Sequence, residues 1–202
     1  MRNNRNMARG IFIILAVIIV FIFVLLLVPA EAYENEPVRT ARQETLHEAA
    51  DILRSYGYAE DSEVITRLKT EWWNEQERLA ITAKVIQFEA DPQWCEWKHS
   101  VAVGAVVVNR ERSPHFPNTI REVVAQPGQY LKSYTYDFSG VSELAYLAAK
   151  AALDGDHDVP PDAFWQDNKV QGVSIWRRFE VTTIYGFHSV TYICCGIPEV
   201  AE

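Results

Sequence analysis

One segment near the N-terminus limits where the rest of the chain can fold. Residues Ile11 to Val28 form an uncharged apolar run of eighteen residues, IFIILAVIIVFIFVLLLV. At about 1.5 Å per residue, a helix of this length spans roughly 27 Å, close to the hydrocarbon thickness of a bilayer. A helix on the surface of a soluble domain would carry a polar face, and this run has none. The run therefore predicts a transmembrane helix over residues 11–29.

The charges on either side of this helix predict its orientation. Three arginines precede the run within residues 1–10, and three glutamates follow it within residues 31–36. The positive-inside rule places the N-terminus in the cytoplasm and everything beyond about residue 30 on the other side of the membrane. Ala30-Glu31-Ala32 also fits a signal-peptidase site, and cleavage after Ala32 would make the protein secreted. Because signal peptides usually have apolar regions of only ~7–15 residues, we favour an uncleaved, single-pass anchor.

The chain after the apolar run is acidic, which bears on its partners. The whole chain has a formal net charge of −8, and three of its basic residues belong to the N-terminal tail. Nucleic-acid binding draws most of its affinity from clustered lysines and arginines that neutralise phosphates, and the sequence has no such cluster. The predicted partners are therefore a lipid bilayer, through residues 11–29, and a ligand other than nucleic acid.

Three cysteines, Cys95, Cys194 and Cys195, lie on the predicted extracytoplasmic side, where disulfides form. A bridge from Cys95 to Cys194 or to Cys195 would close a loop of about 100 residues and stabilise the fold by up to about 4–5 kcal/mol. Which cysteines pair is left open. A catalytic Cys95–His99 pair is the alternative, although nothing in this Trp- and Pro-containing region indicates a lowered thiol pKa.

The organisation of the chain follows from its hydrophobic pattern. Residues 30–39 are acidic and irregular, which indicates a short stalk. An amphipathic helix is predicted over residues 40–56, ended by Gly57, and further helix over residues 61–90 in one or two segments. The predicted parts are a cytoplasmic tail (1–10), a transmembrane helix (11–29), a stalk (30–39), membrane-proximal helices (40–75) and a C-terminal domain (76–202).

The C-terminal domain combines helix and strand signals. HSVAVGAVVVNR, residues 99–110, is apolar without a break and fits a buried helix or a buried strand. Residues 141–155 predict a helix with Leu144, Leu147, Ala148 and Ala151 at helical spacing. The short β-branched and aromatic stretches AFWQ, VSIW, FEVTTIYG and SVTYICC then predict a small C-terminal antiparallel sheet. The predicted fold class is α+β, mostly helical.

Glu89 stands at the end of an apolar helical stretch, LAITAKVIQFEA. On a helical projection, residues 79–90 carry two apolar arcs, and Glu89 lies in a gap between them. If both arcs pack, apolar neighbours remove water from the carboxylate and raise its pKa, the state that a general acid needs near neutral pH. The alternative is that Glu89 caps the helix or reaches solvent.

Several motifs occur in a specific order between residues 78 and 196. LAITAKVIQFEA is followed by VAVGAVVVNRERSPHFPNTIREVVAQPGQY, then by a helix ending in AALDG and by the late histidine His188. This order resembles that of the SleB-type cell wall hydrolases, the spore-cortex-lytic enzymes. The resemblance implies a lysozyme-like catalytic domain over residues 76–202, a helix at residues 99–110, and action on the glycan strands of peptidoglycan, with Glu89 as the catalytic residue.

The reaction that the resemblance implies is lytic transglycosylation. One glutamate protonates the glycosidic oxygen and then, as a base, directs the C6 hydroxyl of muramic acid onto C1, giving a 1,6-anhydro product. This scheme needs no second carboxylate, unlike that of most glycosidases. Hydrolysis by water is the alternative if Asp91 or Glu96 supplies a second carboxylate. A rival of another class is a membrane-tethered glycan-binding or scaffold protein without turnover.

The chain departs from the family pattern at three motifs, which affects the predicted substrate contacts. One is WCEWKH, residues 94–99, which replaces a Gly-rich connection. The family often has Gly-Gln-Phe-Ser where Tyr130-Leu131 follows Gln129, and Gly-Asn-His where Phe187 precedes His188. Amides pair with hydroxyl and N-acetyl groups, and aromatic faces stack on pyranose rings, although aromatic residues also fill cores. The predicted substrate-binding residues are Gln126, Gln129, Tyr130, Tyr134, Trp165, Gln166 and His188.

No metal or other cofactor is predicted. The stretch Asp154-Gly-Asp156-His157-Asp158 opens like a calcium-binding loop. Val159 and Trp165 stand where such a loop needs its glycine and its final glutamate. The histidines show no zinc-ligand spacing. An exposed acidic turn is the better interpretation of residues 154–158.

Overall fold

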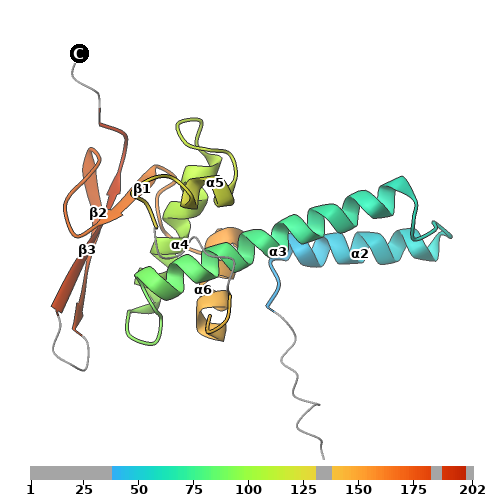
Figure 1. Ribbon diagram of the computed structural model, residues 1–202, viewed down its shortest axis with the longest axis horizontal. Coiled ribbons are helices and arrows are strands. Elements are labelled where there is room, and N and C mark those ends of the chain that lie inside the picture. Colours follow the sequence, from blue (N-terminus) through green and yellow to red (C-terminus); the bar gives the residue numbers. More distant parts are fainter. Residues whose placement is uncertain (1–37, 131–137, 183–187, 199–202) are drawn as a thin grey trace, which may run out of the picture. The chain divides into compact units, whose positions relative to one another are not determined.

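A computed structural model describes residues 38–130, 138–182 and 188–198 (Figure 1). The helices in these ranges are α2 (Ala41–Ser55), α3 (Glu63–Glu89), α4 (Trp97–Arg112), α5 (Ile120–Val124) and α6 (Glu143–Asp154). The strands are β1 (Ala163–Asp167), β2 (Ser174–Thr182) and β3 (His188–Cys195). A mostly helical α+β fold is thereby confirmed.

The predicted transmembrane helix, residues 11–29, lies outside the described residues, as do the cytoplasmic tail and most of the stalk. Within the described ranges, every helix is either too short or too polar to cross a bilayer.

Helix α2 begins at a capping box and packs along the first half of α3 (Figure 1). The Thr40 hydroxyl accepts a hydrogen bond from the backbone N–H of Gln43, and the side-chain oxygen of Gln43 accepts one from the backbone N–H of Thr40. These two bonds satisfy backbone donors that the start of a helix leaves free. Helix α3 is one continuous helix of 27 residues. The predicted boundary at residues 75/76 therefore falls inside α3, and the residues from Val38 onward belong to one compact unit.

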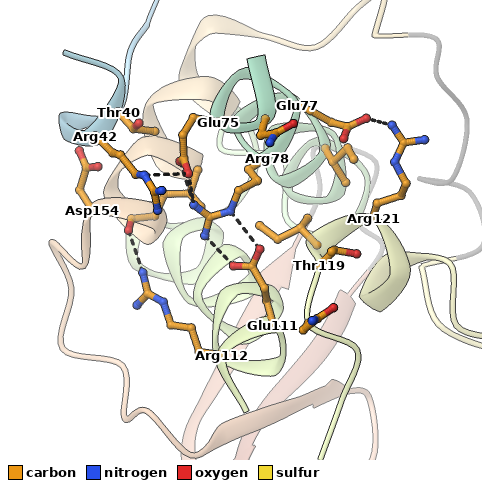
Figure 2. A pocket seen from close by; sticks show the side chains of 15 residues that line it. Thr40, Arg42, Glu75, Glu77, Arg78, Glu111, Arg112, Thr119, Arg121 and Asp154 are labelled. Atoms are coloured by element: carbon orange, nitrogen blue, oxygen red, sulfur yellow. Dashed lines mark hydrogen bonds and ion pairs between the residues drawn. The ribbon is translucent and has the colours of Figure 1, made fainter. Parts of the chain in front are cut away.

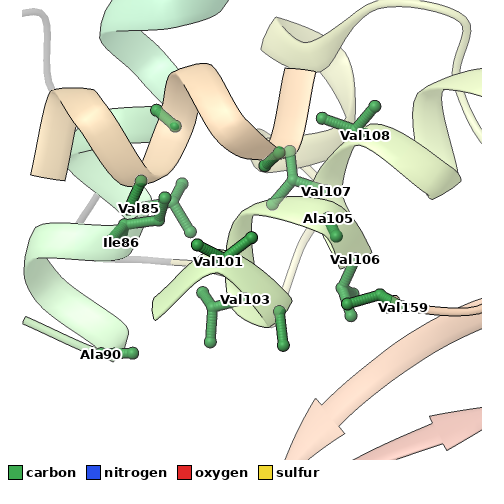
Figure 3. Close-up of a cluster of buried hydrophobic side chains, with 14 of the residues drawn as sticks. Val85, Ile86, Ala90, Val101, Val103, Ala105, Val106, Val107, Val108 and Val159 are labelled. Carbon is green, nitrogen blue, oxygen red and sulfur yellow. The ribbon is translucent and has the colours of Figure 1, made fainter. Parts of the chain in front are cut away.

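The core lies where α4 packs against α3 and α6, and α4 is buried along most of its length (Figure 3). Residues 99–110 are helical, as the resemblance implies and as the pattern alone left open. Gly104 allows the three helices to approach closely. A Cβ at this position would lie 2.8 Å from Cδ1 of Ile86 and 2.9 Å from Cβ of Ala152.

The buried face of α6 consists mainly of alanines. Leu144 and Leu147, two of the four residues that indicated the helix by their spacing, are exposed at 48% and 38%. Close approach at Gly104 of α4 requires small side chains on α6, so the helix turns its alanines inward. The fully buried alanines are Ala145, Ala148, Ala149 and Ala152.

The C-terminal sheet has the strand order β1-β3-β2, and both pairings are antiparallel, as predicted. The predicted stretches VSIW and FEVTTIYG both contribute to one strand, β2, which ends at Thr182 and has a register irregularity between Ile175 and Arg177. Two side chains of α4 hold the sheet and the segment before it by hydrogen bonds. Asn109 donates to the Pro160 carbonyl at 2.8 Å, and Arg110 donates to the Phe164 carbonyl at 2.6 Å.

All three cysteines are free thiols, so the prediction of a bridge from Cys95 is wrong in this structure. Cys194 and Cys195 lie in the central strand β3, paired with β1 and β2, whereas Cys95 lies in the turn between α3 and α4. Burial and the charge of Asp91 raise the pKa of Cys95 to about 11, which disfavours the thiolate.

His99, the proposed partner of Cys95, is buried and stacks on Phe179 with ring centroids 4.6 Å apart. Burial lowers the pKa of His99 to about 4, so its ring is a weak base. A thiol with a raised pKa and a weakly basic imidazole are the opposite of what a cysteine nucleophile needs.

Candidate active site

Glu89 is the last residue of α3, and its side chain is exposed. The prediction of a dehydrated carboxylate is therefore wrong in this structure. Residues 81–86 are buried on all sides of the helix, including Thr82 and Lys84, but burial decreases at Gln87, and Phe88 is 54% exposed. Exposure therefore increases within the last turn of α3, at Phe88 and Glu89.

The turn after Glu89 is fixed by Asp91 and Gln87. Asp91 accepts from the Gln87 amide at 2.6 Å and from the Gln93 backbone at 2.9 Å, so both of its oxygens are engaged. The Gln87 Oε1 accepts from the Ser142 amide at 2.9 Å and hydroxyl at 2.7 Å, which joins the end of α3 to the start of α6. Asp91 therefore shapes the turn, and Glu96 is the exposed carboxylate of this segment that remains as a second acid.

Exposed aromatic side chains lie on both sides of Glu89 in the chain. Phe88 precedes it, and Trp94 and Trp97 follow in the turn before α4 and at its first residue. Sequence reasoning did not name these rings as candidate substrate contacts, although WCEWKH was a visible departure from the family pattern. Large exposed apolar side chains beside a carboxylate are a surface on which a sugar can stack.

Arg110 organises a second group of predicted residues. It lies in the last turn of α4 and is only 2% exposed. Its Nε donates to the Phe164 carbonyl of β1 at 2.6 Å, and its Nη1 donates to Oε1 of Gln129 at 2.8 Å. Arg110 thus joins β1 to the loop that follows α5.

Three aromatic rings surround the Arg110 guanidinium. Its Cζ lies 5.2 Å from the ring centroid of Phe116, 5.4 Å from that of Trp165 and 5.7 Å from that of Tyr130. Such cation–π contacts stabilise a desolvated cation without a carboxylate. The Trp165 indole donates to the Gly196 carbonyl at 2.8 Å, which fixes its ring. The result is a rigid cluster that carries a positive charge.

Tyr130 connects this cluster electrostatically to Glu89. It is 7% exposed and has a left-handed backbone, with φ of 41°, which is uncommon for a residue other than glycine. Burial raises the pKa of Tyr130 to about 12, while the charge of Arg110 lowers it and that of Glu89 raises it. Both charges therefore act on one buried ring whose hydroxyl has no hydrogen-bond partner in the described part of the chain.

The structure brings together some of the predicted substrate-binding residues. Gln129, Tyr130 and Trp165 meet around Arg110. Gln126 is half-buried after α5, and Gln166 is half-buried in β1 with its Oε1 buried and unpaired among the described residues. Tyr134 lies outside the described residues.

His188 does not join this group. It pairs with Thr182 at one end of β3, whereas Trp165 pairs with Cys194 near the other end. Six residues of strand separate these positions by roughly 20 Å. The His188 ring is exposed and contacts the Thr182 hydroxyl at 3.2 Å and Glu180 at 3.8 Å.

A separate cavity of about 680 Å³ opens between α2, α3, α4 and α5 (Figure 2). Arg78 is central to it. This residue bonds both oxygens of Glu75 at 2.8 Å and pairs with Glu111 at 2.6 Å. Burial lowers the pKa of Arg78, but the hydrogen bonds and charges of Glu111 and Glu75 outweigh it and raise the pKa overall. Arg42 adds an ion pair to Glu75, so the network joins three helices.

The carboxylates of the acidic turn, residues 154–158, form hydrogen bonds and ion pairs with neighbouring protein groups. Asp154 accepts from the Ala41 amide at 3.0 Å and from Lys150 at 2.6 Å. Asp158 pairs with Lys98 and with Arg177. Across the described ranges, no three His, Cys, Asp or Glu side chains are grouped so that they could hold a metal ion.

Residues 96–189 match the model of the Cell Wall Hydrolase family. The match runs from the start of α4 into β3 and includes Arg110, Gln129, Tyr130 and Trp165. The chain carries a SleB-type cell wall hydrolase domain. This cell wall hydrolase domain is that of an enzyme acting on peptidoglycan, which confirms the resemblance. The match begins after Glu89, and no match was found among curated proteins or among solved structures.

Proposed function

We propose that the cell wall hydrolase cleaves the glycan strands of peptidoglycan by lytic transglycosylation, with Glu89 as general acid and then general base. The supporting observation is the position of Glu89. Its carboxylate is exposed at the end of α3, and its charge acts on Tyr130, whose ring packs on Arg110 within the matched domain. A lysozyme-like arrangement of the catalytic helix and the sheet is part of the proposal.

The proposed reaction moves one proton through Glu89. The protonated carboxyl group gives its proton to the glycosidic oxygen as the bond from C1 to that oxygen breaks, and the neighbouring sugar leaves with a free hydroxyl. The Glu89 carboxylate then takes the proton of the muramic acid C6 hydroxyl as O6 bonds to C1. The glutamate ends protonated, ready for another cycle, and no water is consumed.

A general acid has to carry its proton when the glycosidic oxygen reaches it, and burial of a carboxyl group favours that form. A glycan strand stacked on Phe88, Trp94 and Trp97 would displace water from Glu89 and raise its pKa. We therefore expect a bound glycan strand to favour the protonated form of Glu89.

Membrane attachment is the second part of the proposal. The apolar run of residues 11–28, with arginines before it and glutamates after it, supports a single-pass anchor with the enzyme domain outside the cytoplasm. Fractionation of cells, followed by protease treatment of intact spheroplasts, tests this placement. Release of the domain by protease supports it, and protection of the domain in intact spheroplasts contradicts it.

The products test the reaction type. Purified full-length protein is incubated with purified peptidoglycan, and the released muropeptides are analysed by mass spectrometry, with Glu96→Gln as the matched variant. We expect 1,6-anhydro ends from both proteins. Reducing ends that disappear in Glu96→Gln would show hydrolysis with Glu96 as the second carboxylate. If peptidoglycan is bound and nothing is released, the protein is a glycan-binding module.

A further inference from the structure

We propose that Arg110 is a positioning residue that orients the Gln129 amide toward the N-acetyl carbonyl of the substrate, so that Gln129 selects N-acetylated glycan strands. The inference rests on the proposed function, because it assumes that glycan strands bind beside Arg110. It deepens that function by naming the chemical group on the sugar that the domain distinguishes.

The orientation of Gln129 follows from the chemistry of arginine. A guanidinium group only donates hydrogen bonds, so the Gln129 atom that lies 2.8 Å from Nη1 of Arg110 has to be the carbonyl oxygen. The planar amide then directs its two N–H groups away from Arg110. Gln129 is only half-buried, so these donors are available to a ligand. The amide is thereby fixed as a donor toward the substrate.

Arg110 is rigid enough to impose this orientation. It is 2% exposed, its Nε is bonded to the Phe164 carbonyl, and three rings enclose its guanidinium. The next residue after Gln129, Tyr130, adopts a left-handed backbone and packs its ring on the same guanidinium. The chain therefore bends sharply at the point where it presents Gln129 to Arg110.

Position 129 has an amide side chain, although a carboxylate there would compensate the buried charge of Arg110 better. In the described ranges, Arg110 forms no ion pair with an acid, while its neighbour Glu111 pairs with Arg78. A cation buried among neutral partners loses hydration that an adjacent carboxylate would offset. Glutamine gives up this stabilisation and keeps an N–H donor at the surface.

A fixed N–H donor distinguishes two forms of amino sugar. An acetamido group offers its carbonyl oxygen as an acceptor. The free amine left by de-N-acetylation is an ammonium group at neutral pH, which only donates. Sites built around one hydrogen bond discriminate strongly against a ligand that leaves it unmade, since a buried polar group then remains unpaired. We therefore expect the domain to prefer N-acetylated strands.

Glutamate at position 129 should reverse this preference without removing the contact to Arg110. One carboxylate oxygen keeps the bond to Nη1 as an ion pair, and the other faces the ligand as an acceptor. It accepts from an ammonium group and repels an acetamido carbonyl. Gln129→Glu is thus an isosteric change of donor to acceptor.

The experiment compares two substrates and four proteins. Purified glycan strands, and the same strands after chemical de-N-acetylation, are given to the full chain as wild type, Gln129→Glu, Arg110→Lys and Gln76→Glu. Gln76 lies on α3, roughly 20 Å along the helix from Glu89, so Gln76→Glu adds the same charge away from the cluster. Both kcat and KM are measured, and thermal melting confirms that each variant is folded.

We expect the ratio of kcat/KM for acetylated over de-acetylated strands to fall at least tenfold in Gln129→Glu, mostly through KM. The ratio should decrease in Arg110→Lys, which keeps the charge and loses the fixed fork of donors, and should stay at the wild-type value in Gln76→Glu. An unchanged ratio in folded, active Gln129→Glu overturns the inference.

Failure of the proposed function would look different. If wild type turns over neither substrate, the proposed function fails, and the same ratio is then measured as binding of the two kinds of strand. A binding ratio that Gln129→Glu lowers supports the selection, and one that it leaves unchanged overturns it.

Discussion

Arg78 and Arg110 are arginines with opposite kinds of partners. Arg78 is held by the carboxylates of Glu75 and Glu111, so its charge is compensated. Arg110 is held by two carbonyl oxygens and three aromatic rings and has no carboxylate partner within the described ranges. Glu111 and Arg110 are adjacent on α4, and one turn of that helix serves both groups. We infer that the first group holds helices together and the second prepares a site for a ligand.

Replacing Arg78 should have the largest effect on stability. Arg78→Met leaves Glu111 without its partner and Glu75 with only its ion pair to Arg42, which should lower the free energy of unfolding by about 3 kcal/mol. Chemical denaturation measures this loss. Turnover per folded molecule should be unchanged, because the Arg78 cavity lies apart from Glu89.

The matched control for Arg78→Met also neutralises its partners. Adding Glu75→Gln and Glu111→Gln should recover much of the stability, since no buried charge is then left alone. Loss of turnover in a folded Arg78→Met protein would contradict the division into a structural and a functional arginine.

Compared with Arg78→Met, Arg110→Met should lower the free energy of unfolding less and lower turnover more. The variant loses two hydrogen bonds from a charged donor, which together contribute about 2 kcal/mol to stability. Among the described residues, no carboxylate loses an ion-pair partner. Turnover should fall by about tenfold or more because Gln129 is no longer held. Denaturation and kinetics on the same preparation separate the two effects, and wild-type kinetics would contradict a positioning role.

Acid should destabilise the protein through His99, a buried group with neither carboxylate nor carbonyl partners among the described residues. Its pKa is about 4 when folded and about 6.5 when unfolded, so the unfolded chain binds the proton more readily as pH falls below 6.5. The loss should reach about 2 kcal/mol by pH 5 and be absent above pH 7. His99→Phe, which keeps a ring on Phe179, should remove this part of the pH dependence. An identical pH profile in the variant would contradict burial as its cause.

Gly104→Ala tests the close packing of α4 against α3 and α6. Its effect on stability should be the smallest of those predicted. The added methyl group would lie 2.8 Å from Cδ1 of Ile86 and 2.9 Å from Cβ of Ala152. Overpacking of this kind costs about 1–2 kcal/mol, partly offset by the better helix propensity of alanine. Thermal melting measures the change, and a more stable variant would show that α6 can move away from α4.

The sequence predicts where the helices and strands lie better than it predicts which of their faces pack against each other. A helix buried on every side, such as residues 99–110, shows no polar face, so its pattern fits a strand equally well, and the family resemblance was needed to decide. Helical spacing alone did not show which face of α6 is buried, because side-chain size at Gly104, rather than hydrophobicity, determines which residues face the core.

Positions that depend on long-range placement could not be predicted from the pattern. The exposure of Glu89 depends on where the helices covering α3 end, and the separation of His188 from Trp165 depends on strand register. The Arg78–Glu111 pair joins residues 33 apart in sequence. Three of the predicted sugar contacts, Gln129, Tyr130 and Trp165, nevertheless meet at Arg110.

Glu89→Gln compared with Glu96→Gln tests the catalytic role of Glu89 most directly. The two glutamates are exposed residues on either side of the same turn, and glutamine preserves the size of each while removing its proton transfer. We expect kcat for release of muropeptides to fall at least about 10²-fold in Glu89→Gln, with binding to peptidoglycan and melting temperature unchanged, and to stay near the wild-type value in Glu96→Gln. Equal release by wild type and Glu89→Gln would contradict the account.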